Sequence, residues 1–305
     1  MKTRTRAIAA VAVTLLTGVL VTGCASESST TADPITEFEH THGLGYDPDR
    51  GIVFAATHTG VWELPTSRLP SSFGSGSLIS PPGNVPVLIE NRQQDTMGFF
   101  VTDTGLILGS GHPDPADATA PANLGLIMSD SAAREWTTVS LAGEVDFHDI
   151  AAVPTPSGAL RIYGYDATHA RILTSDDGGS TWSDGAAVEL RDMTIDPSNP
   201  DRTYVTTASG LQVSDDVART FSPVPDAPAL VLIDATDTGY VGIDVAGTVW
   251  HTTGAGWVQG GAIVGDPQAL TFVGGSEPWL LVSDSRGVFA TRDFGVSTVL
   301  LAKSP

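Results

Sequence analysis

The chain contains seven histidines, and four of them flank predicted strands in its first half. His42 and His148 come just before predicted strands, in HTHGLGYD and DFHDIAAV, whereas His58 and His112 lie in predicted turns. Met97, in DTMGFFVTD, takes the place in its segment that His42 takes in HTHGLGYD. Neutral imidazoles are ligands for zinc, copper or iron, and a methionine among them favours copper. These five side chains form a candidate site for a divalent metal or copper ion.

The candidate ligands are far apart in the sequence, and their spacing differs from compact metal motifs such as HExxH. A site therefore requires a fold that brings separate segments together. His40 and His169 occur near the same segments, as do carboxylates that could orient the imidazoles, at Asp95, Asp114, Asp146 and Asp149. For any single histidine a hydrogen-bonded loop position is the simpler interpretation. Their gathering on one face is what would indicate a functional site.

Short runs of Val, Ile, Leu, Phe, Tyr and Thr alternate with Gly, Pro, Asp and Asn, and no sustained helical period follows residue 24. This pattern predicts an all-β fold. A short strand opening with glycine or a substitute recurs about every forty residues, in GVWEL, GLIMSD, ARILTSDD, GLQVSDD, GTVWHTT and GVFATRD. Since four short strands per repeat are typical of a propeller blade, the sequence predicts a six-bladed β-propeller, with inserts at 65–86 and 111–123.

Turns in an up-and-down blade alternate between the two ends of the propeller. The start of the first strand and the turn between the second and third strands share one end. This rule places Met97 and the four histidines at one mouth of the channel. The turns between third and fourth strands belong to the other end.

The stretch RILTSDDGGSTWSD, residues 171–184, contains the Asp-box pattern, which is made of Ser175, Asp177, Gly179, Thr181 and Trp182. Its glycine permits a positive φ, its polar side chains satisfy loop N–H groups, and its tryptophan anchors a hairpin. An EF-hand calcium loop is excluded, because no glutamate closes it. Weaker copies are predicted at Ser214, Asp216, Thr220 and Phe221; at Thr291, Asp293, Gly295 and Thr298; at Ser129 and Trp136; and at Trp257.

The first 24 residues combine basic residues, an apolar run and a small-residue site that ends at Cys24, as in a secretory signal. Val-Thr-Gly-Cys resembles a bacterial lipobox, so we expect Cys24 to carry lipid and to hold the protein on the extracytoplasmic face of the cell membrane. The expected domains are a signal peptide at 1–23, the lipidated cysteine and a tether at 24–34, and one propeller at 35–305. A net charge of −20 excludes nucleic acid as a general partner and leaves the lipid as the membrane contact. We expect a monomer.

Eight segments together resemble bacterial lipid-anchored BNR/Asp-box propellers labelled glycosyl hydrolases or exo-α-sialidases, which are distantly similar to the sortilin/VPS10 propeller. The segments are HTHGLGYDP, ATHTGVW, DTMGFFV, SGHPDP, LGLIMSD, DFHDI, YGYDA and SDDGGSTW. The resemblance implies a propeller and a glycan substrate. It departs from sialidases in lacking their three arginines, since only Arg191 is placed on the histidine-bearing face.

Under this resemblance a pair of carboxylates would hydrolyse the glycan, and the candidates are Asp95, Asp114, Asp149 and Asp192. The spacing selects no pair among them. Three functions therefore stay open: a glycan-active hydrolase, a zinc- or copper-binding surface protein, and a non-catalytic scaffold for a surface protein partner. The sequence also leaves open whether ITEFEH, residues 35–40, closes the ring by adding a strand to the last blade.

Overall fold

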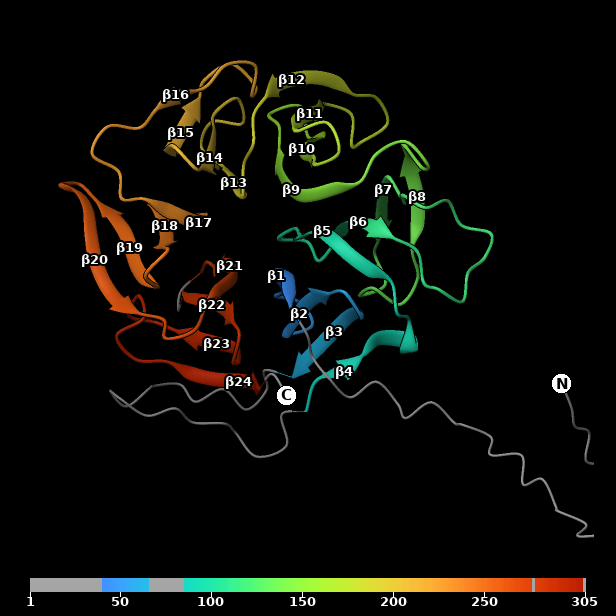
Figure 1. Ribbon diagram of the computed structural model, residues 1–305, viewed down its shortest axis with the longest axis horizontal. Helices are drawn as coiled ribbons and strands as arrows, with labels where there is room; N and C mark the ends of the chain where they lie inside the picture. The colour runs from blue at the N-terminus through green and yellow to red at the C-terminus, as the bar shows by residue number, and fades with distance from the viewer. Residues whose placement is uncertain (1–39, 66–84, 276–277, 304–305) are drawn as a thin grey trace, which may run out of the picture. The chain divides into compact units, whose positions relative to one another are not determined.

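The computed structural model describes residues 40–65, 85–275 and 278–303, which belong to one compact unit, Thr36–Pro305. The predicted signal peptide, Cys24, the tether and most of the insert at 65–86 lie outside the described residues. The described residues form six four-stranded antiparallel sheets around an axis (Figure 1). The predicted all-β, six-bladed propeller is confirmed. Within the described ranges no helix is long and apolar enough to cross a bilayer.

Each blade pairs four consecutive strands in chain order. The first blade contains β1 (Thr41–Asp47), β2 (Ile52–Thr57), β3 (Gly60–Pro65) and β4 (Val87–Leu88), followed by the short 3₁₀ turn η1 (Ile89–Asn91). The second contains β5 (Asp95–Val101), β6 (Ile107–His112), β7 (Leu126–Ser129) and β8 (Thr137–Ser140). The third contains β9 (Phe147–Pro154), β10 (Leu160–Asp166), β11 (Arg171–Ser175) and β12 (Ser183–Ala187).

The other three blades follow the same plan. The fourth contains β13 (Asp192–Ile195), β14 (Thr203–Thr207), β15 (Gly210–Ser214) and β16 (Ser222–Pro223). The fifth contains β17 (Leu230–Thr236), β18 (Gly239–Asp244), β19 (Thr248–Thr253) and β20 (Gly256–Ala262). The sixth contains β21 (Pro267–Val273), β22 (Trp279–Asp284), β23 (Gly287–Thr291) and β24 (Val299–Lys303). The third strands β3, β7, β11, β15, β19 and β23 coincide with the six recurring segments that predicted the blades.

The first strands of neighbouring blades contact one another around the whole ring, and β1 contacts both β5 and β21. The backbone N–H of Thr41 donates to the Gln268 side chain at 3.0 Å, which joins the first blade to the last. In the part of the chain that the structure describes, every blade is complete without a strand from another blade. Residues 35–39 of ITEFEH lie outside that part.

The hairpin loop between β11 and β12 is held by side-chain hydrogen bonds. Ser175 Oγ accepts the N–H groups of Asp177 and Gly179 at 3.3 and 2.8 Å, and Asp177 accepts both the N–H and the hydroxyl of Thr181. Trp182 Nε1 donates to the Gly179 carbonyl at 3.0 Å. Gly179 has a φ of +87°, which glycine adopts without strain.

Equivalent bonds surround Asp216 in the fourth blade and Asp293 in the sixth. In the sixth blade the hydroxyl residue that donates to the aspartate is not the predicted one. Asp293 binds the N–H and hydroxyl of Ser297, at 2.8 and 2.6 Å, so the assignment to Thr298 was wrong by one position. The copy predicted at Trp257 is also wrong. The pairing of Thr253 with Gly256 leaves a two-residue turn between β19 and β20, too short for this loop.

Replacing Ser175 by alanine should lower the free energy of unfolding by about 2 kcal/mol, because the buried N–H of Gly179 loses its acceptor. Equilibrium urea unfolding would measure the loss. Ser180→Ala is the matched control, since its exposed hydroxyl donates only to a loop carbonyl, at 3.1 Å. Equal losses in the two variants would contradict the assigned role of Ser175.

Candidate metal centre

His42 is placed at the channel mouth by an irregularity in the first blade. Thr41 pairs with Thr57 and Gly43 pairs with Ala56, so His42 is an extra residue in β1. Such a bulge bends a strand and redirects a side chain. Gly43 has no side chain, and a Cβ there would lie 2.8 Å from the Cβ of Phe99, so β5 packs closely against β1 at this point.

His58 begins the turn between β2 and β3, and Thr57 fixes this turn. Thr57 Oγ1 accepts the Thr59 N–H at 3.1 Å and the Trp62 indole N–H at 3.2 Å, and it donates to the Gly60 carbonyl at 2.9 Å. The hydroxyl also lies 3.2 Å from Thr59 Oγ1, and its several hydrogen bonds hold the short turn in one conformation. Asp95, the first residue of β5, reaches the same place from the second blade.

Three side-chain atoms from these two blades converge. His42 Nε2 lies 3.1 Å from His58 Nδ1, His58 Nδ1 lies 3.1 Å from Asp95 Oδ1, and His42 Nε2 lies 3.8 Å from Asp95 Oδ1. A triangle with these sides has its centre about 2.0 Å from each atom, close to a zinc–nitrogen or zinc–oxygen bond length. The atoms are thus already spaced as ligands of one small cation.

His42 is uncharged at neutral pH. Burial, followed by the neighbouring imidazoles of His58 and His40, lowers the pKa of His42 to about 3. Its approach to Asp95 is therefore not an ion pair at that pH. A neutral imidazole keeps a free lone pair, which is the form that binds metals.

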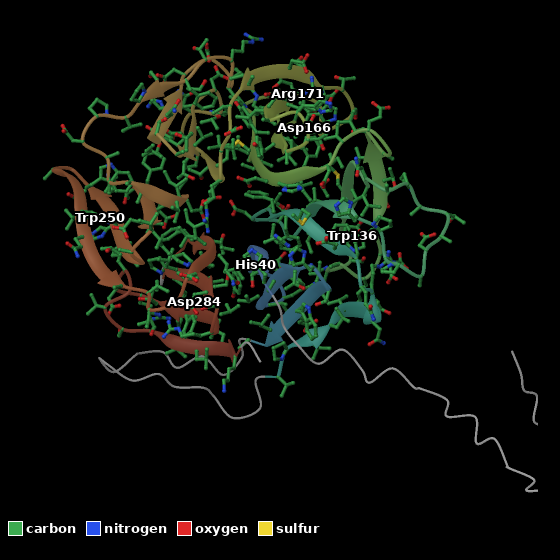
Figure 2. All side chains as sticks on the ribbon, in the orientation of Figure 1. His40, Trp136, Asp166, Arg171, Trp250 and Asp284 are labelled. Carbon is green, nitrogen blue, oxygen red and sulfur yellow. The ribbon has the colours of Figure 1, made fainter. Side chains whose placement is uncertain are left out.

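His40 completes the histidine group around this mouth. Its ring centroid lies 5.1 Å from that of His42 and 6.0 Å from that of His58. Figure 2 labels His40 close to the centre of the ring. Burial lowers the pKa of His40, and His58 and Arg191 lower it further. The sequence pattern placed His40 near this face but did not select it as a ligand.

Two of the other predicted ligands, His112 and His148, approach one carboxylate, whereas Met97 is not brought to either group by any described contact. His148 Nε2 lies 2.9 Å from Asp146 Oδ2, and His112 Nε2 lies 3.6 Å from the same oxygen. Met97 follows Asp95 on β5, in a stretch where the β5–β6 register is irregular. His169 is separate from both groups, since its Nδ1 pairs with Asp166 at 2.7 Å.

The candidate catalytic carboxylates have different surroundings. Asp114 accepts backbone N–H groups of Gln93 and Ala116, each at 2.8 Å, and so stabilises the loop after β6. Asp192 accepts the Ile233 N–H at 2.6 Å, which ties β13 to the first strand of the next blade. Burial raises the pKa of Asp149 well above its usual range, and the carboxylate of Asp192 raises it further.

Asp234 repeats this tie between blades, because it accepts the Phe272 N–H of β21 at 2.7 Å. Burial raises the pKa of Asp234 to about 6, while an aspartate in an unfolded chain titrates near pH 4. Folded protein therefore holds this proton at pH values where unfolded protein has lost it. The contribution of the group to stability is largest below about pH 4 and falls as the pH rises to about 6.

The Asp234→Asn variant, which has no such proton, should lose less stability than wild type between pH 4 and pH 7. Urea unfolding at several pH values would measure the two slopes, and identical slopes would contradict the raised pKa. Titration of Asp177 and Asp216 does not affect the slopes between pH 4 and pH 7. Hydrogen bonds, first those from Thr181 and Thr220, lower their pKa values to about 2, so their contributions change below pH 4.

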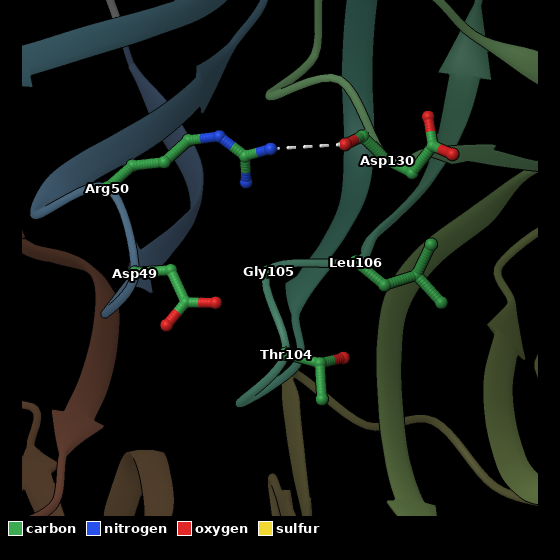
Figure 3. A pocket seen from close by; sticks show the side chains of 6 residues that line it. All are labelled: Asp49, Arg50, Thr104, Gly105, Leu106 and Asp130. Atoms are coloured by element: carbon green, nitrogen blue, oxygen red, sulfur yellow. Dashed lines mark hydrogen bonds between the residues drawn. The ribbon is translucent and has the colours of Figure 1, made fainter.

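A hollow of about 490 Å³ lies at the other end of the propeller (Figure 3). Its lining comes from the turns after β1 and β5 and the loop after β7: Asp49, Arg50, Thr104, Gly105, Leu106 and Asp130. Arg50 is engaged there, since it pairs with Asp47 at 2.5 Å and donates to the Asp130 carbonyl at 3.4 Å. Because it lies at the opposite end of the propeller, the hollow is separate from the histidine centre.

Comparison with known proteins gives the fold. No protein-family model and no curated protein sequence matches the chain. It is similar to the structure of a gluconolactonase from Xanthomonas campestris, with a TM-score of 0.58, 11% identity, and coverage of 84% of this chain and 86% of that one. It is also similar to a structure from a nidogen/laminin complex, with a TM-score of 0.57, 14% identity, and coverage of 82% and 92%. These likenesses show the propeller fold and extend no further.

Proposed function

We propose that the protein is a metal-binding surface protein that holds a zinc or copper ion through His42, His58 and Asp95. The observation that carries this proposal is the triangle of three donor atoms, whose centre lies about 2.0 Å from each of them. Two imidazoles and a carboxylate are a common ligand set for zinc. Calcium and magnesium prefer all-oxygen sites and fit these residues poorly.

The site would retain an open coordination position. The His58 side chain is 46% exposed, so one side of the triangle faces solvent. Zinc sites with three protein ligands keep a fourth position for water or substrate, whereas structural zinc sites are closed by four protein ligands. His40 is the nearest further imidazole and would compete with water for that position.

Calorimetric titration of the metal-free protein with zinc, copper and magnesium tests the proposal. We expect at least one equivalent of zinc or copper to bind and magnesium not to bind. A ligand present at 100 times its dissociation constant should stabilise the fold by about 2.7 kcal/mol, which urea unfolding would detect. Failure of both zinc and copper to bind or to stabilise the protein would reject the proposal.

A glycan-active hydrolase, implied by the resemblance to BNR/Asp-box propellers, is the second candidate. The observation that favours it is Asp149, whose Oδ2 is buried without a hydrogen-bond partner and whose pKa is raised, as in a general acid. In that function Asp149→Asn would abolish sugar release from a glycan panel, whereas His42→Ala would leave it intact. Loss of sugar release in His42→Ala but not in Asp149→Asn would instead indicate that the reaction depends on the metal site.

We also propose that Cys24 carries the lipid that holds the propeller at the extracytoplasmic face of the membrane. The support is the position of the cysteine directly after the apolar run and small residues of the signal segment. Cys24→Ser should move the protein from the membrane fraction to the soluble fraction. Unchanged fractionation would contradict the anchor.

A further inference from the structure

We propose that the channel mouth binds a tetrahedral oxyanion, such as the phosphate or sulfate group of a small ester, between the ion at His42, His58 and Asp95 and the guanidinium of Arg191. The inference rests on the proposed function, because the ion supplies one of the two cationic contacts. It adds the chemical class of the ligand that occupies the open position of that ion. The support comes from the bulges of the first strands, the anchored position of Arg191, the absence of a carboxylate partner for it and the place of His40.

The bulge that places His42 recurs in the first strands of other blades. The β9–β10 register shifts at His148 and the β21–β22 register shifts at Gln268, so each is an extra residue in its strand, as His42 is in β1. Bulges redirect side chains and are common next to active sites. Gln268 shows the direction, since its Oε1 accepts the Thr41 N–H of the first blade at 3.0 Å. The strands that surround the axis in Figure 1 therefore direct polar side chains to one mouth.

Arg191, which directly precedes β13, reaches past the fifth blade to the sixth. Its Nη2 donates to the Pro267 carbonyl at 2.7 Å. The next residue, Gln268, accepts the backbone N–H of the residue that follows His40. Burial is the main cause of the lowered pKa of His40, and the positive charge of Arg191 contributes to it. The guanidinium is thus held beside the histidines of the mouth.

Arg191 forms no ion pair with a carboxylate of the described residues. Six other arginines there do, namely Arg50, Arg134, Arg161, Arg171, Arg202 and Arg286. The neighbouring Asp192 binds the Ile233 N–H at 2.6 Å instead, and burial raises the pKa of Asp192, which reduces its negative charge at neutral pH. In a chain with 35 acidic and 15 basic residues, this exposed guanidinium remains available to an external anion.

His40 adds a hydrogen-bond donor beside the ion. Its ring centroid lies 5.1 Å from that of His42, and an imidazole carries at least one N–H in either charge state. Arg191 presents paired N–H donors, which fit the oxygens of a phosphate. A tetrahedral group offers a separate oxygen to the ion, the guanidinium and the imidazole, which a planar carboxylate does not. The charges suit a dianion, because Asp95 neutralises only half the charge of a divalent ion and Arg191 adds a positive charge.

Calorimetric titration of protein loaded with zinc or copper tests the inference, with methylphosphonate and sulfate as probes and the metal content measured before and after. We expect at least one probe to bind wild type. Arg191→Gln should bind it about tenfold more weakly, the usual effect of losing a hydrogen bond between charged groups. Arg219→Gln is the matched control and should keep wild-type affinity, because Arg219 is also exposed but lies in the loop between β15 and β16, at the other end. Planar acetate should bind more weakly than the better probe.

The metal content separates the two proposals. Full metal content with equal affinity in wild type and Arg191→Gln, or with no binding of either probe, would overturn the inference and leave the proposed function intact. Failure to retain zinc or copper would reject both. Acetate binding as tight as that of the probes would overturn the ligand class, whereas the tighter of the two probes indicates a phosphate or a sulfate ester. If Arg191→Gln fails to fold, Arg191→Lys gives the same test, because lysine lacks the paired donors and should also weaken binding.

Discussion

Replacing His42 by alanine is expected to weaken zinc binding at the proposed site by about 100-fold or more, since loss of an outer hydrogen-bond partner alone costs about 10–100-fold. His42 is one of three donor atoms around a point about 2.0 Å from each. Its removal leaves one imidazole and one carboxylate. Competition with a chromophoric zinc chelator would measure the change.

The matched control is His169→Ala, because His169 is also a histidine bound to a carboxylate, at 2.7 Å from Asp166. It lies outside the triangle and should leave zinc affinity unchanged. Equal losses in the two variants would indicate that zinc binds histidines without selection. An unchanged affinity in His42→Ala would place the ion elsewhere and contradict the proposed site.

The fold was largely predictable because its signals are local. Each third strand opens with glycine or a substitute, and the turn residues recur at the repeat length, so the blades can be counted from the sequence alone. The error at Thr298 has a similarly local cause. Ser297 and Thr298 are adjacent hydroxyl residues, and only the hydrogen bonds to Asp293 show which of them belongs to the loop.

The candidate centre was less predictable because it depends on side-chain direction. Alternation of turns predicts which end of the propeller a histidine occupies, but it does not predict which nitrogen meets which oxygen. The bulge at His42 and the turn held by Thr57 bring His42 and His58 together with Asp95, which the sequence offered as a carboxylate near the imidazoles and as a catalytic candidate, but not as a ligand. His112 and His148 meet at Asp146 instead, a residue that the sequence showed only as a nearby carboxylate.

Phe147→Ala is expected to lower the free energy of unfolding by about 3–5 kcal/mol, the usual cost of truncating a fully buried aromatic side chain. The Phe147 side chain is 0% exposed and packs in the core between the second and third blades. Its ring centroid lies 5.0 Å from that of Trp182. Gly164 faces the ring, and a Cβ at that position would meet it at 2.5 Å. Urea unfolding of the metal-free protein would measure the loss.

Phe147→Leu is the conservative comparison, and it should lose less than half as much stability because it leaves a smaller cavity. Phe147 also stands between Asp146 and His148, so its packing helps to position this pair, whose Oδ2 and Nε2 atoms lie 2.9 Å apart. At a temperature where Phe147→Ala stays folded, its zinc content should match that of wild type, because His42, His58 and Asp95 belong to the first and second blades. A stability loss below about 1 kcal/mol would contradict the packing argument.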